Sequence, residues 1–121
     1  MDCVKNKYNV LIQEQSSKIN KTQLEIDILL KNIEHNQLML IEDKKYMDNF
    51  IRFKLNPEKE SNKQNKELIY ELENELKEDE DLLLEIENNI NKDILKYEQL
   101  KEDLHIQEQV LYYYKSSIST L

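Results

Sequence analysis

Asn56-Pro57-Glu58-Lys59-Glu60-Ser61 is the stretch that decides the fold of this 121-residue chain. It contains the only proline, and the chain has no glycine. On either side runs a polar segment with an apolar residue at every seventh position. Upstream these residues are Ile12, Ile19, Ile26, Ile33, Leu40 and Met47, and downstream they are Ile69, Leu76, Leu83, Ile90, Tyr97, Leu104, Leu111 and Ile118. A sustained seven-residue apolar repeat is typical of helices that pack together as a coiled coil.

The two apolar series mirror each other about residue 58. A fold-back at the proline therefore places Ile26 level with Ile90, and Ile33 level with Leu83. Without glycine or further prolines, the chain lacks the turns that a sheet protein needs. We predict one all-α domain over 1–121, a long antiparallel two-helix coiled-coil hairpin. Its expected parts are a helix at 2–55, a turn at 56–61 and a helix at 62–119.

Two details of this hairpin stay open at the level of sequence. Asn56 can cap a helix that begins at Pro57, or 56–59 can form a type I turn. In the second case Ser61 caps the next helix and Gln64 completes a capping box. The mirror centre favours this second arrangement. Residues 88–93 are poor helix formers, and a break there would give a three-helix bundle instead.

Composition and charge narrow the classes of partner. The chain carries a net charge of −8, and residues 56–121 hold an excess of acids over bases. Nucleic acid is not an expected partner, because phosphate binding requires a basic surface. No apolar run is long enough for membrane insertion. The single cysteine, Cys3, cannot form an internal disulfide. We expect a cytoplasmic location, with the nucleus as the alternative.

The sequence also lacks the groupings that catalysis requires. Only two histidines occur, His35 and His105, and the hairpin keeps them far apart. No serine or cysteine has a histidine beside it, and a phosphate-binding loop needs glycine. We therefore expect no enzyme activity, no cofactor, no metal and no small-molecule substrate.

Apolar residues away from the seven-residue seam indicate a second contact surface. Leu24, Ile28, Leu38 and Ile41 fall on the outer side of the first helix, and Leu82 and Leu84 lie off the seam of the second. An acidic run over 71–87 accompanies them and includes Glu78, Asp79, Glu80 and Asp81. Apolar stripes of this kind usually mark a contact. We expect them to bind a partner helix or a second copy of the chain in a four-helix bundle, with the acids at the rim.

These features favour a non-catalytic coiled-coil interaction or scaffold subunit of a larger cytoplasmic assembly. A small helical chaperone is the alternative. Asn56-Pro57 followed by Lys63-Gln64 loosely resembles a connection in tubulin-folding cofactor A, over less than a tenth of the chain. That family's third helix has no counterpart in this sequence. An acidic chaperone or stalk protein of a secretion apparatus fits the charge and the helical pattern equally well.

Overall fold

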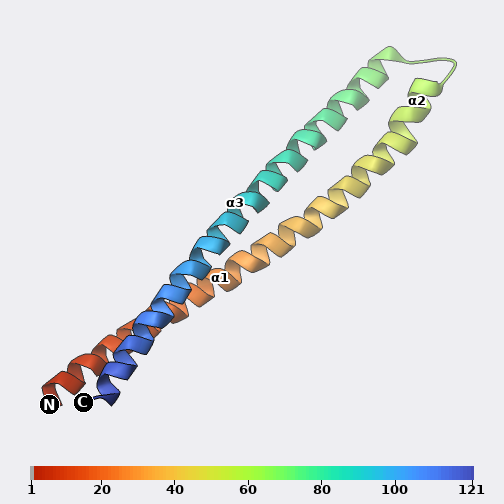
Figure 1. Cartoon of the computed structure of the whole chain (residues 1–121). Coiled ribbons are helices and arrows are strands. Elements are labelled where there is room, and N and C mark those ends of the chain that lie inside the picture. Colours follow the sequence, from red (N-terminus) through yellow and green to blue (C-terminus); the bar gives the residue numbers. More distant parts are fainter. Residues whose placement is uncertain (1) are drawn as a thin grey trace. The chain divides into compact units, whose positions relative to one another are not determined.

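The structure, a computed structural model, describes residues 2–121 and is helical over nearly all of them. Helix α1 spans Asp2–Phe50, the π-helical turn η1 spans Ile51–Leu55, the short α2 spans Asn56–Glu60 and α3 spans Lys66–Ser119 (Figure 1). None of the residues from 2 to 121 forms a strand. The helical run through Glu60 packs against α3, which confirms the predicted all-α hairpin.

The chain divides into two compact units, and each contains one stretch of α1 and one of α3. The terminal unit comprises Met1–Asn32 and Asp93–Leu121, and the turn unit comprises Ile33–Lys92. In the terminal unit the rings of Tyr8 and Tyr114 lie 6.4 Å apart, centroid to centroid. In the turn unit Lys44 of α1 forms an ion pair with Glu87 of α3. The two helices are therefore antiparallel neighbours within each unit.

The seven-residue pattern correctly predicts which face of each helix is covered. The buried apolar residues are Ile19, Ile26 and Leu29 in the terminal unit, and Ile33, Phe50, Leu55, Leu83, Ile86 and Ile90 in the turn unit. All but Leu55 occupy a or d positions of the heptads. Phe50 is the most buried of them, with 2% of its surface exposed.

Leu55 is buried because η1 changes the heptad register. The unbroken repeat would place Lys54 at the next core position after Phe50. In η1 the N–H of Asn56 bonds to the carbonyl of Ile51, five residues back, so the turn holds one residue more than an α-helical turn. Leu55 consequently takes the core position, and the Lys54 ammonium lies 5.7 Å from the centre of the Phe50 ring.

The turn lies at 61–65 and not at the predicted 56–61. Pro57 lies in the first turn of α2, which continues directly from η1, and its fixed φ suits a helix. Ser61 is extended, with φ −67° and ψ 142°, and ends α2. Asn65, and not Ser61, caps α3, because its side-chain oxygen accepts a hydrogen bond from the Leu68 N–H at 3.2 Å.

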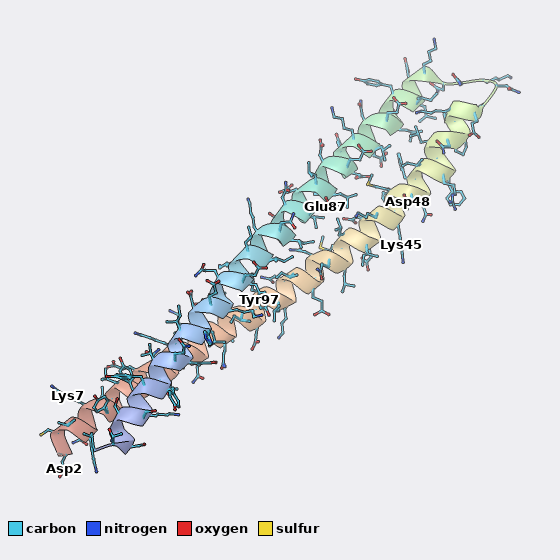
Figure 2. The ribbon with its side chains drawn as sticks, viewed as in Figure 1. Asp2, Lys7, Lys45, Asp48, Glu87 and Tyr97 are labelled. Carbon is cyan, nitrogen blue, oxygen red and sulfur yellow. The ribbon has the colours of Figure 1, made fainter. Side chains whose placement is uncertain are left out.

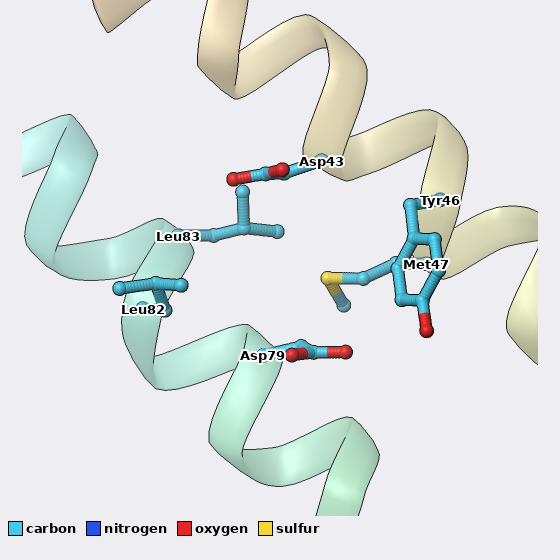
Figure 3. A pocket seen from close by; sticks show the side chains of 6 residues that line it. All are labelled: Asp43, Tyr46, Met47, Asp79, Leu82 and Leu83. Carbon is cyan, nitrogen blue, oxygen red and sulfur yellow. The ribbon is translucent and has the colours of Figure 1, made fainter.

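Moving the turn also shifts the pairing of the two helices. A turn over 61–65 centres the hairpin near residue 63, so the expected level pairs about residue 58 are wrong. In the turn unit Leu83 lies beside Asp43 instead of Ile33, and Asp79 lies beside Met47 (Figure 3). The heptads themselves could not distinguish these registers, since a shift along a repeating seam still places seam against seam.

Helix α3 continues without a break through 88–93, so the three-helix alternative is wrong. The asparagines in this stretch are weak helix formers, but Ile86 and Ile90 are both buried, at 8% and 6% exposed. Tertiary packing of one apolar face outweighs a propensity deficit of a few tenths of a kcal/mol per residue.

Candidate functional site

The apolar residues predicted to lie off the seam are exposed. Leu24 and Ile28 in the terminal unit are 60% and 53% exposed, and Leu38 and Ile41 in the turn unit are 55% and 53% exposed. Residues three or four apart share a helix face. Each pair therefore forms one apolar patch on the outside of α1, within its own unit.

The predicted residues on α3 do not form one surface. Leu82 and Leu84 are both exposed, at 50% and 56%. Residues two apart lie about 200° apart around a helix, so these leucines lie on different sides of α3. The acids divide in the same way: Glu78, Glu80 and Asp81 are exposed, whereas Asp79 is half-buried on the seam.

A groove lies between α1 and α3 in the turn unit. It has a volume of about 280 Å³ and is lined by Asp43, Tyr46, Met47, Asp79, Leu82 and Leu83 (Figure 3). Leu83 is buried, and Tyr46 and Leu82 are half exposed, at 52% and 50%. The groove thus has apolar walls and two carboxylates, one from each helix.

The groove holds carboxylates without a protein cation. The Oδ2 atom of Asp79 is inaccessible to solvent and has no hydrogen-bond partner. The ion pairs found within residues 2–121 join Lys44 to Glu87 at 3.5 Å and Lys59 to Glu73 at 2.8 Å. Other charged side chains, such as Lys45, lie exposed on the outside of the helices (Figure 2). The structure therefore leaves the negative charge inside the groove uncompensated.

Sequence reasoning did not identify this groove. It placed Met47 on the seven-residue seam and Asp79 in the acidic run over 71–87. The available signal was the pair of aspartates at d positions, Asp43 and Asp79, because apolar residues normally occupy these positions. Without the correct register, however, the sequence could not show that both side chains line the same hollow.

The terminal unit has polar residues in its seam. Gln15 and Thr22 are both buried, at 7% exposed. The side-chain N–H of Gln15 donates to the Gln107 carbonyl at 3.0 Å. The side-chain oxygen of Gln107 is buried without a partner. Polar seam residues of this kind lower stability and can specify register.

No grouping over residues 2–121 brings together three or more histidine, cysteine or acidic side chains able to hold a metal ion. His35 is exposed, and His105 is exposed and hydrogen-bonded to Gln109 at 3.1 Å. No helix in the described part of the chain is long and apolar enough to cross a membrane. No family model, curated protein or solved structure matches the chain.

Proposed function

We propose that the chain is a non-catalytic coiled-coil interaction subunit of a larger cytoplasmic assembly, which binds helical partners through its outer surfaces. One observation carries this proposal. Four large apolar residues of the acidic turn unit are each at least half exposed: Leu38, Ile41, Leu82 and Leu84. Large apolar side chains in such numbers outside the seam favour a contact surface. Scattered singly, they would need no explanation.

The shape of each unit supports the same proposal. Two paired helices bury only the seam between them, and nine apolar residues between 2 and 121 are buried in this structure. The remaining sides of both helices are free to bind another helix, as they do in four-helix bundles. A partner helix would cover apolar surface that the hairpin leaves in water.

The proposal is tested by capturing partners from the native source. Wild-type chain should retain a defined set of proteins, identified by mass spectrometry. The variant Leu24→Gln/Ile28→Gln/Leu38→Gln/Ile41→Gln should keep its helix content by circular dichroism and lose that set. Glu34→Gln/His35→Gln, at exposed polar positions of the same helix, is the control. Retention of the same proteins by the quadruple variant, or of none by the wild type, would count against the proposal.

A further inference from the structure

The groove of the turn unit combines features that select one kind of occupant. Asp43 and Asp79 project into it from α1 and α3, and the Oδ2 atom of Asp79 is buried without a partner (Figure 3). A buried carboxylate oxygen that has lost water and gained no hydrogen bond is costly. A cation placed between the two aspartates would stabilise both carboxylates by Coulomb attraction.

The walls of the groove fit a long cationic side chain. Lysine and arginine bury an apolar stem against apolar surface and keep the charged head in polar surroundings. Tyr46, Met47 and Leu82 supply the apolar surface, and the two aspartates supply the acceptors. Tyr46, which is 52% exposed, also supplies an aromatic ring, and the faces of aromatic rings attract cations.

The charge of the whole turn unit distinguishes between possible sources of that side chain. Residues 33–92 contain nine Lys/Arg and sixteen Asp/Glu, which gives a net charge of −7. A second turn unit would carry the same charge and be repelled. A basic helix would be attracted from a distance and held in register by complementary charge.

We propose that this groove is the docking site for a basic amphipathic helix of a partner protein, with one lysine or arginine inserted between Asp43 and Asp79. The apolar face of the helix lies along Tyr46 and Leu82, and its other cations face the exposed acids Glu75 and Glu78, which flank the groove on α3. This inference rests on the proposed interaction function and specifies the class of partner.

The test uses the full chain and a model peptide of leucine and lysine that forms a basic amphipathic helix. Asp43→Asn/Asp79→Asn removes both groove charges at constant side-chain size. Glu80→Gln/Asp81→Asn changes the net charge equally at exposed positions of α3 outside the groove. Calorimetry should show the groove variant binding at least about tenfold more weakly than wild type, and the control variant less than about threefold. Circular dichroism establishes that both variants are folded.

Four results would overturn the inference. One is equal weakening by both variants, because the peptide would then respond only to net charge. Another is no binding of the peptide to wild type. The third is binding of Ca²⁺ alone, lost in Asp43→Asn/Asp79→Asn, because the aspartates would then be metal ligands. Native partners that are lost with the Leu24, Ile28, Leu38 and Ile41 substitutions but kept by Asp43→Asn/Asp79→Asn would refute the groove and leave the interaction function standing.

Discussion

Asn65 determines where α3 begins. Its side-chain oxygen accepts a hydrogen bond from the third N–H of the helix, and its carbonyl accepts one from Ile69 at 3.0 Å. The Glu58 carboxylate accepts a further hydrogen bond from the Asn65 N–H at 3.4 Å. These bonds satisfy backbone groups that a helix start leaves without partners. The cap therefore ties the last turn of α2 to the first turn of α3.

Replacing Asn65 by alanine should lower the free energy of unfolding by about 1 kcal/mol, the usual cost of losing an N-cap. Asn62→Ala is the matched control, because Asn62 is an exposed residue of the same turn. Urea unfolding monitored by circular dichroism measures both variants. Equal stabilities of the two would show that Asn65 does not cap α3.

Gln107 is the opposite case, because removal of its buried side-chain amide should stabilise the fold. Its backbone carbonyl accepts the Gln15 hydrogen bond, but its side-chain oxygen is buried without a partner. Gln107→Leu keeps the first interaction and removes the second group. We expect a gain of about 1 kcal/mol in stability, because an unsatisfied buried polar group costs roughly that much or more.

The control for Gln107 is Glu108→Leu, at the exposed neighbouring position. It should change stability by less than about 0.5 kcal/mol. Thermal unfolding of both variants at one protein concentration gives the comparison. If Gln107→Leu is less stable than wild type, the Gln107 side-chain amide has a hydrogen-bond partner after all.

At the scale of elements, η1 reconciles two conflicting features of the sequence. Lys54 occupies the position where the heptad requires an apolar residue, and Leu55 follows it. One extra residue in the turn moves Leu55 into the core, where it is 4% exposed, and leaves Phe53 67% exposed. The widened turn also lies directly before Pro57, which would otherwise clash with the carbonyl four residues back.

This register change predicts very different effects for two neighbouring residues. Leu55→Ala should cost about 2–4 kcal/mol, as expected for a large apolar side chain removed from a core. Phe53→Ala removes a larger side chain but should cost less than about 0.5 kcal/mol, because the ring is mostly in water. Urea unfolding of both variants checks the prediction, and a larger loss for Phe53→Ala would place the wrong residue in the core.

The seam could be predicted from sequence because burial follows the seven-residue period regardless of how the two helices are paired. The position of the turn could not, because proline suits the first turn of a helix as well as a turn. Asn65 is a stronger N-cap candidate than Ser61, because the acidic residue Glu67 comes two residues later, in the first turn of α3. The seven-residue period also predicts that the leucines off the seam are exposed. The groove could not be predicted, because its lining depends on the register in which the two helices pair.

At the scale of the whole molecule, the main difference between the two units is their net charge. The turn unit carries −7, whereas the terminal unit, with eight Lys/Arg and nine Asp/Glu, carries −1. Both units have exposed apolar side chains, including Leu24 in one and Leu38 in the other. A cationic partner is therefore favoured at the turn unit, and an uncharged contact, or one between copies, faces less repulsion at the terminal unit.

The fold-back itself predicts which residues near the two ends of the chain can be joined. In a Cys3→Ser background, Tyr8→Cys/Tyr114→Cys should be cross-linked within one chain by a short dithiol-reactive reagent, because the two tyrosine rings are neighbours. A hairpin centred on residue 58 would instead bring residue 8 level with residue 108. Tyr8→Cys/Glu108→Cys should therefore cross-link poorly, since six residues along a helix amount to about 9 Å. Gel electrophoresis and mass spectrometry of dilute protein distinguish the products. Cross-links formed only between chains would replace the hairpin with straight helices that pair intermolecularly.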